Sequence, residues 1–168
     1  GIFNRSQYEE VLVVRVHPEI LNYQKLPVTP DLEKIWDERL TSIRQQEEHL
    51  ARNGTVILKF WLNVSREEQK NRFLARLDDP DKNWKFEPKD VVERRYWDDY
   101  MQAYEAALNA TSRPWAPWYA IPADDKRYMQ ARVAETVIEA LQSIGLEYPE
   151  PSADDRAEFA AAREELSE

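Results

Sequence analysis

Six basic side chains between residues 72 and 95 have the types and spacing that could hold phosphate groups. They are Arg72, Arg76, Lys82, Lys85, Arg94 and Arg95. Arg72 and Arg76 stand one helical turn apart, so their two guanidinium groups could grip one anion. Phosphoryl-transfer enzymes work mainly by positioning and by stabilising negative charge, which such a clamp supplies. Because residues 66–95 contain nine basic and eight acidic side chains, a solvated face of salt bridges is an equally good interpretation.

The polar residues Asn4, Arg5 and Ser6 form a second candidate site. They follow the apolar residues 1–3, which are predicted to end a strand. In open α/β sheets ligands bind at the C-terminal ends of the strands, so an amide and a guanidinium there could hold a metal-bound water and a phosphate. On its own, the same pattern is also typical of an ordinary polar turn.

The composition excludes several other kinds of site. Glycine occurs only at Gly1, Gly54 and Gly145, so the chain contains no glycine-rich Walker loop. The absence of cysteine excludes disulfides and thiolate metal sites. His17 and His49 lie far apart in the sequence without companion ligands, so no metal site built by protein residues is predicted.

The net charge of −9 is concentrated near the C-terminus. Residues 147–168 contain eight acidic residues and two arginines, so local basic clusters in the rest of the chain could still bind an anion. No stretch has the length of a membrane span, and no signal pattern is visible at the N-terminus. We therefore expect a soluble, cytoplasmic protein that binds neither a membrane nor nucleic acid.

The elements that must position these side chains alternate between strands and helices. Strands are predicted at 55–63 and 118–121, and helices at 31–52, 65–77, 90–109 and 124–143. Residues 6–17 are ambiguous, because their β-branched residues favour a strand whereas Ser6 could cap a helix. This order indicates an α/β domain with a parallel sheet over residues 1–146. The acidic tail, residues 147–168, forms either a solvated helix or no helix.

Two expectations about packing follow from the same patterns. Ser65 and Glu68 have the spacing of a capping box at the start of their helix. Trp97, Tyr100 and Tyr104 recur at helical spacing and are predicted to lie in the core rather than to stack on a ligand.

Several longer motifs resemble those of one known family. They are RLDDPDKNWK at 76–85, RYWDDY at 95–100, Thr111-Ser112, and APWYAIPADDK at 116–126. Together and in this order they are similar to the family-2 polyphosphate kinases, over about residues 1–146. Several motifs in a fixed order are far more specific than any single pattern.

The resemblance implies a P-loop kinase-like, three-layer α/β core with a parallel sheet and a helical lid at about residues 72–95. It implies phosphoryl transfer between inorganic polyphosphate and AMP or ADP, giving ADP or ATP, with Mg²⁺ or Mn²⁺ as cofactor. It also implies assembly into dimers or tetramers. Phe3–Ser6 corresponds to the Walker B segment, and residues 6–17 are expected to be helical.

The resemblance also assigns roles to side chains. The catalytic candidates are Asn4, Arg5 and Arg76. The substrate-binding candidates are Glu9, Glu10, Arg72, Lys82, Lys85, Arg94 and Arg95. Among these, Arg5, Arg76 and Lys85 are expected to touch phosphate, and Glu9 and Glu10 to lie near the acceptor nucleotide.

Two departures from the family pattern bear on activity. Asn4 stands where many members carry aspartate, a feature of a subgroup that accepts both AMP and ADP. The family's Gly-x-Asp-x-x-Gly-Lys loop should precede Gly1, so we expect an N-terminally incomplete core with an unpaired sheet edge and an uncovered apolar face. The alternative function is a non-catalytic module that binds polyphosphate or a homologue.

Overall fold

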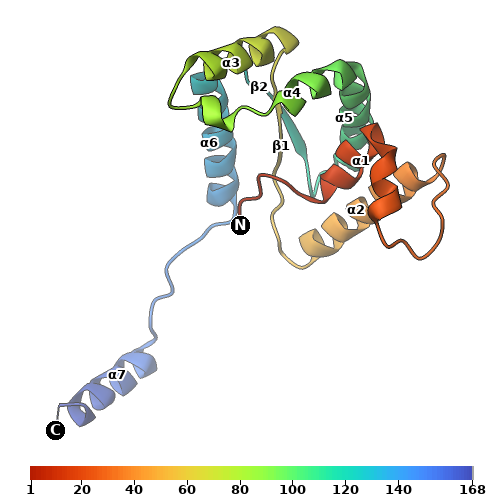
Figure 1. The fold of residues 1–168 in the computed structure, drawn as a ribbon. Helices are drawn as coiled ribbons and strands as arrows, with labels where there is room; N and C mark the ends of the chain where they lie inside the picture. The colour runs from red at the N-terminus through yellow and green to blue at the C-terminus, as the bar shows by residue number, and fades with distance from the viewer. Residues whose placement is uncertain (168) are drawn as a thin grey trace. The chain divides into compact units, whose positions relative to one another are not determined.

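The computed structural model describes residues 1–167 (Figure 1). Its elements in chain order are η1 (Gln7–Glu10), α1 (Val13–Val16), η2 (Pro18–Tyr23), α2 (Ile35–Arg52), β1 (Lys59–Asn63), α3 (Arg66–Asp78), η3 (Asn83–Lys85), α4 (Pro88–Glu93), η4 (Arg94–Tyr96), α5 (Trp97–Thr111), β2 (Trp118–Pro122), α6 (Lys126–Ser143) and α7 (Ala153–Glu165), where η denotes a 3₁₀ helix. The chain divides into two units, Gly1–Glu135 and the residues from Thr136 onward. Every candidate site residue lies in the first unit.

The sheet consists of β1 and β2, which run parallel with Lys59 opposite Trp118 and Asn63 opposite Pro122. Helices α3 to α5 form the crossover between the two strands, so the predicted α/β class with a parallel sheet is confirmed. Strand β1 begins four residues later than predicted. Within residues 1–167 each strand pairs only with the other, and Leu62 of β1 is half exposed.

The ambiguous segment after Ser6 is helical. The Ser6 hydroxyl accepts a hydrogen bond from the Tyr8 N–H (3.4 Å) at the start of η1. Tyr8, Val11 and Val14 are buried at a spacing of three residues, which fits one face of a helix better than the alternation of a strand. The predicted strand end at residues 1–3 is wrong, because no described segment pairs with these residues and their side chains are exposed.

The hydrophobic core joins η1, α2 and α5. Tyr8, Val11 and Leu12 pack with residues of α2 and with Ala103 and Ala107 of α5. These alanines allow the α5 backbone to approach its neighbours closely, so small side chains occupy the fully buried face of the helix.

The predicted core residues of α5 are confirmed only for Tyr104, which packs against the core cluster, whereas Trp97 and Tyr100 are not part of that cluster. Trp97, Tyr100 and Tyr104 are only partly buried, and Tyr104 stacks on Trp61 at 5.5 Å between ring centroids. The aromatic rings flank the alanine face and cover its margins instead of filling the centre.

Residues 66–96 cover α3, η3, α4 and η4, and this range includes the lid implied by the resemblance; we call it the lid segment. The single helix predicted over 90–109 is wrong, because η4 interrupts it between α4 and α5 (Figure 1). Pro88 fits the first turn of α4, where no N–H is needed. None of residues 66–96, all of which the structure describes, is fully buried.

The second unit contains the end of α6 and helix α7. Ser152 and Asp155 form a complete capping box at the start of α7, with both hydrogen bonds present. The side chains of α7 are exposed, so the tail takes the first of its two predicted forms, a solvated helix. Among the described residues, no helix combines the length and the apolar character that crossing a membrane would require.

Candidate functional site

The N-terminal candidates separate onto two sides of η1. Arg5, whose side chain is 72% exposed, donates from Nε to the Glu9 carboxylate one turn later. Glu10 instead binds Arg39 of α2, whose Nη1 lies 2.6 Å from Glu10 Oε2. The structure therefore brings Arg5 and Glu9 together and places Glu10 in a different cluster.

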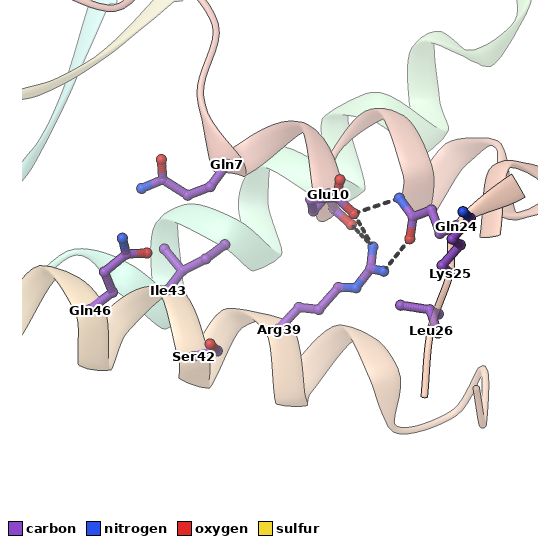
Figure 2. Close-up of a pocket in the computed structure, with 9 residues that line it drawn as sticks. All are labelled: Gln7, Glu10, Gln24, Lys25, Leu26, Arg39, Ser42, Ile43 and Gln46. Atoms are coloured by element: carbon purple, nitrogen blue, oxygen red, sulfur yellow. Dashed lines mark hydrogen bonds and ion pairs between the residues drawn. The ribbon is translucent and has the colours of Figure 1, made fainter. Parts of the chain in front are cut away.

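Glu10 belongs to a cavity of about 520 Å³ between the N-terminal segment and α2 (Figure 2). Its lining residues are Gln7, Glu10, Gln24, Lys25, Leu26, Arg39, Ser42, Ile43 and Gln46. Figure 2 shows Arg39 between Glu10 and Gln24. Nη2 of Arg39 donates to Oε1 of Gln24 at 2.6 Å. Because Gln24 also donates to Glu10 (2.9 Å), the polar groups of this cluster satisfy one another.

Arg72 lies at the C-terminal ends of the strands, where α/β proteins bind ligands. Its Nη2 donates to the backbone oxygens of Ala123 (2.6 Å) and Asp124 (3.0 Å), just after β2, and its Nε donates to Glu68 (2.8 Å). These contacts attach α3 to the loop after β2. Three of the five guanidinium N–H groups are thus engaged within the protein.

Asp124 makes a second attachment at the same place. Its Oδ1 accepts the Ser65 N–H at 2.7 Å, and this backbone hydrogen bond is the main cause that lowers the pKa of Asp124. The capping box predicted at Ser65 is therefore only half present. The Ser65 hydroxyl accepts the Glu68 N–H (3.1 Å), but the Glu68 carboxylate binds Arg72.

Arg94 connects two elements within the lid segment. Its Nη1 donates to the Arg66 backbone oxygen (3.0 Å) and to Gln69 Oε1 (2.6 Å), so η4 is tied to the first turn of α3. Arg95, the next residue, is exposed.

The remaining lid candidates have short-range neighbours. The guanidinium of Arg76 lies 5.9 Å from the ring centroid of Phe73, and Nζ of Lys85 lies 4.9 Å from that of Trp84. Lys82 forms an ion pair with Asp79. Such exposed local contacts contribute about 0–1 kcal/mol each, so a polyanion can displace them at small cost.

A histidine contact links the lid segment to the N-terminal region. Protonated His17 donates from Nε2 to Glu93 Oε2 (3.0 Å) and from Nδ1 to Glu19 Oε1 (3.2 Å). The Tyr100 hydroxyl donates to the same Glu93 oxygen (3.1 Å). Burial lowers the pKa of His17, but hydrogen bonds and negative charge from Glu93 and Glu19 outweigh it, so the pKa is raised.

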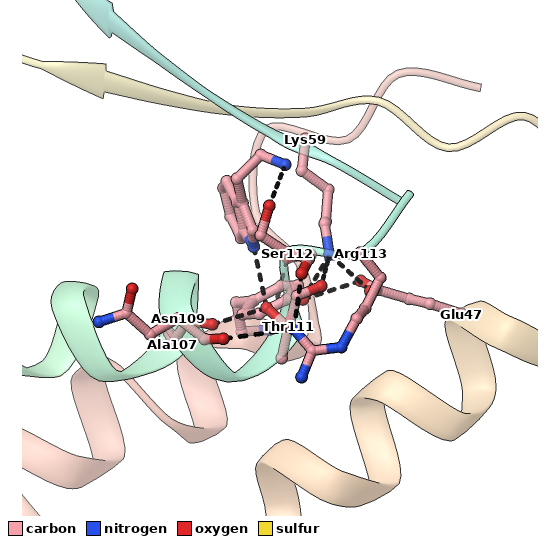
Figure 3. A network of polar contacts seen from close by, with 10 residues as sticks. Glu47, Lys59, Ala107, Asn109, Thr111, Ser112 and Arg113 are labelled. Carbon is pink, nitrogen blue, oxygen red and sulfur yellow. Dashed lines mark hydrogen bonds and ion pairs between the residues drawn. The ribbon is translucent and has the colours of Figure 1, made fainter. Parts of the chain in front are cut away.

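A buried polar network lies beneath η1 (Figure 3), and the sequence patterns did not reveal it. Lys59 of β1 and Glu47 of α2 are 8% and 3% exposed, and Lys59 Nζ lies 2.6 Å from Glu47 Oε2. The Tyr8 hydroxyl donates to Glu47 Oε1 at 2.9 Å. One signal was available: Glu47 continues the apolar stripe of Leu40 and Ile43 at helical spacing, where a charge is out of place.

Comparison with known proteins identifies the family of the chain. The sequence profile of the family described as Polyphosphate kinase 2 matches residues 1–148. The chain belongs to the polyphosphate kinase 2 family.

Relatives within the family carry informative names. The chain is 50% identical to "ADP-polyphosphate phosphotransferase" of Rhodopseudomonas palustris, over 99% of this chain and 58% of that protein. It is 45% identical to "AMP/ADP-polyphosphate phosphotransferase" of Meiothermus ruber, over 89% of this chain and 52% of that protein. The chain thus spans little more than half the length of these relatives.

A solved structure supports the same fold. The polyphosphate kinase 2 of Arthrobacter aurescens TC1 superimposes with a TM-score of 0.83 and is 41% identical, over 98% of this chain and 54% of that one. The likeness thus extends over nearly all of this polyphosphate kinase 2 family chain, including the lid segment and η1.

The described residues of this polyphosphate kinase 2 family member do not build a metal centre alone. Among residues 1–167, no three His, Asp or Glu side chains are grouped to hold an ion. Asn4 is exposed, and its amide oxygen could at most contribute to an ion held mainly by other ligands. No hydrogen bond or ion pair found within this part of the chain joins Asn4 or Arg5 to the lid segment.

Proposed function

We propose that the full-length protein transfers phosphoryl groups between inorganic polyphosphate and a nucleoside mono- or diphosphate. AMP would be converted to ADP, and ADP to ATP. The observation that carries this proposal is that one member of the polyphosphate kinase 2 family has both an exposed Asn4–Arg5 turn and a lid segment in which Arg76, Lys82 and Lys85 have only weak local partners. Both relatives described above are named for transfer between polyphosphate and adenine nucleotides.

The chemistry requires one bond to form and one to break. A terminal phosphate oxygen of the nucleotide attacks the terminal phosphorus of polyphosphate. The bond from that phosphorus to the bridging oxygen breaks, and its electron pair leaves with a polyphosphate one unit shorter. Negative charge on the transferring group and on the leaving oxygen must be stabilised throughout, and catalysis consists mainly of this stabilisation and of alignment.

The candidate residues suit these tasks. Arg5, on an exposed turn, would bind the transferring phosphate together with Arg76 of α3, and Asn4 would lie beside them. Lys82, Lys85 and the exposed Arg95 would follow the polyphosphate, whose regular charges match a row of cations. Closure of the lid segment would exclude water that otherwise hydrolyses the anhydride.

Arg72 and Arg94 would contribute mainly by placing these cations. Both use their guanidinium groups on protein oxygens, Arg72 after β2 and Arg94 on α3. Glu9 would face the acceptor nucleotide next to Arg5, and Glu10 would support that segment from the cavity side.

A divalent cation belongs to this proposal, Mg²⁺ in the first place and Mn²⁺ as a substitute. When bound, it would neutralise phosphate oxygens that the protein cations do not reach. The proposal also places the reaction in the cytoplasm and in a homo-oligomer, either a dimer or a tetramer.

The test compares two arginines in similar settings. Arg5 and Arg52 are both exposed and both pair with a glutamate four residues away, Glu9 and Glu48. In the full-length protein supplied with polyphosphate, Mg²⁺ and ADP or AMP, Arg5→Ala should lower kcat by about 100-fold, a typical loss for one charge-stabilising donor. Arg52→Ala should leave kcat within twofold. Equal kcat for Arg5→Ala and the parent, or no nucleotide product from the parent, would refute the assignment.

A further inference from the structure

In the buried network beneath η1, all three protons of the Lys59 ammonium group are donated in hydrogen bonds. Lys59 Nζ donates to the Tyr8 hydroxyl (3.0 Å), to Glu47 Oε2 (2.6 Å) and to the Thr111 backbone oxygen (3.0 Å). An ammonium group has three protons, and all three are engaged. Lys59 is therefore closed to substrate, and a direct role in phosphate binding does not fit its environment.

Thr111 extends the network to β2. It is the last residue of α5, where a cation is favourable because the helix ends in unpaired carbonyl groups. Its hydroxyl accepts the Trp118 Nε1–H (2.9 Å) and donates to the Ala107 backbone oxygen (2.6 Å). Figure 3 shows these contacts converging between α2, α5 and the strands.

Tyr8 is where this network meets the candidate site. Its hydroxyl donates to Glu47 and accepts from Lys59, so both roles of the hydroxyl are fixed. Burial, together with the negative charge of Glu47, raises the pKa of Tyr8, which keeps the hydroxyl protonated and able to donate. The ring is held as well, edge-on to Trp118 at 4.9 Å between centroids.

Stability alone is a poor reason for this arrangement. Replacing a buried ion pair by apolar residues of similar volume is often neutral or stabilising, because the desolvation of two charges is avoided. A buried pair has a clearer use where it selects one geometry among several, since each hydrogen bond has a required direction.

We propose that Glu47 and Lys59 are positioning residues that act through the Tyr8 hydroxyl to fix η1, and thereby the orientation of Arg5 and Glu9. Tyr8 is three residues from Arg5 and adjacent to Glu9, within a single turn of 3₁₀ helix capped by Ser6. A rotation of Tyr8 would therefore move both polar side chains. This inference rests on the proposed function only for the consequence of that movement in catalysis.

The kinetic experiment removes one atom in the full-length protein. Tyr8→Phe retains the ring and leaves the Lys59–Glu47 pair intact, so the fold should persist. We expect kcat with polyphosphate and ADP to fall about tenfold, with KM values within twofold, because misplaced groups affect the aligned state most. The control is Leu40→Val, which perturbs the same core cluster outside the network and should leave kcat within twofold. Equal kcat for Tyr8→Phe and Leu40→Val would overturn the positioning role.

A double-mutant comparison tests whether Tyr8 acts on catalysis through Arg5. In an Arg5→Ala background, Tyr8→Phe should lower kcat by clearly less than tenfold, since Arg5, one of the two side chains that Tyr8 positions, is gone. An undiminished tenfold loss would show that Tyr8 acts by another route and would overturn the inference.

A measurement without turnover separates this inference from the proposed function. Hydrogen exchange of the amides of residues 8–12 should quicken at least fivefold in Tyr8→Phe, with no change in α2 beyond that of Leu40→Val. If the parent makes no nucleotide product, the proposed function fails, and this exchange result alone decides whether the network positions η1. Unchanged exchange at residues 8–12 would overturn the inference even in an active enzyme.

Discussion

The core beneath η1 and the lid segment differ in how deeply their charged side chains are buried and in how those side chains are paired. In the core, Glu47 and Lys59 are buried, and each makes at least two hydrogen bonds to partners from other elements. In the lid segment, Lys70 with Glu67 and Lys82 with Asp79 are exposed pairs three residues apart. Attachment of the lid segment to the rest of the fold rests on a few groups, chiefly Arg72 and Glu93, while Arg94 ties η4 to α3 within the segment.

The physical consequence is that the two regions differ in how tightly their contacts constrain them. A buried charge without a partner costs much free energy. The side chains of the core network are therefore restricted to the one arrangement in which all of them are paired. Exposure makes the local contacts of Arg76, Lys82 and Lys85 weak, so these cations can change partners at small cost. Arg5 lies next to the buried network, whereas Arg76 and Lys85 lie in the exposed lid segment.

The largest expected effect comes from breaking the core pair. Lys59→Met leaves Glu47 buried without its cation and should lower the free energy of unfolding by about 3–5 kcal/mol. Lys70→Met removes an exposed lid cation and should change it by less than about 0.5 kcal/mol. Urea unfolding of both variants measures the contrast. Similar values for the two lysines would mean that the core pair is not specially constrained.

The double variant sharpens the same comparison. Lys59→Met with Glu47→Leu removes both buried charges and should recover most of the stability lost by Lys59→Met alone, because the desolvation cost also disappears. Stability no better than that of Lys59→Met would contradict this account of the pair.

An intermediate effect is expected at the lid attachments. Arg94→Ala removes the hydrogen bonds from η4 to α3 within the lid segment and should make local opening of residues 79–96 away from α3 easier by about 1–2 kcal/mol. Limited proteolysis within 79–96 should accelerate about tenfold while the global unfolding midpoint stays close to the parent's. Lys70→Ala, on the exposed face of α3, is the matched control. Unchanged cleavage in Arg94→Ala would show that this attachment does not hold the lid segment.

The smallest expected effect is a pH dependence of stability that arises from the contact between His17 and Glu93 of the lid segment. The pKa of His17 is raised in the folded protein, so its contacts stabilise fully below about pH 6.5, the ordinary value for histidine, and weaken as pH rises through the raised pKa. Relative to His17→Gln, the parent should lose up to about 1 kcal/mol between pH 6 and pH 9. His49→Gln, at an exposed position of α2, should not alter the pH profile. A parallel profile for His17→Gln and the parent would exclude the contact as a source of stability.

Much of the fold could be predicted from the sequence, because its elements depend on local patterns. The strand at 118–121 and the helix ending at Arg52 followed from apolar periodicity and turn residues. The break at η4 could not be predicted, since it depends on Arg94 and Glu93 reaching α3 and His17 across the fold. Likewise, Ala103 and Ala107 gave no signal as core residues until the closeness of α5 to its neighbours was known.

The sequence proposed the members of the candidate site but not how they are arranged. Family motifs pointed to Arg5 and Arg76, yet only the structure separates Glu9 from Glu10 and shows Arg72 engaged with backbone oxygens. The buried network escaped prediction because charged residues rarely occupy a core, and pairing across distant elements has no local pattern.

The most direct test of this division is hydrogen exchange of the full-length protein with and without saturating polyphosphate and Mg²⁺. We expect amides of residues 79–96 to exchange at least fivefold more slowly with polyphosphate, while those of α2 and β1 stay unchanged. Arg76→Ala should reduce the slowing. Unchanged exchange in residues 79–96 at saturating polyphosphate, or equal slowing in lid and core, would contradict the claim that a mobile basic lid closes on polyphosphate over a fixed core.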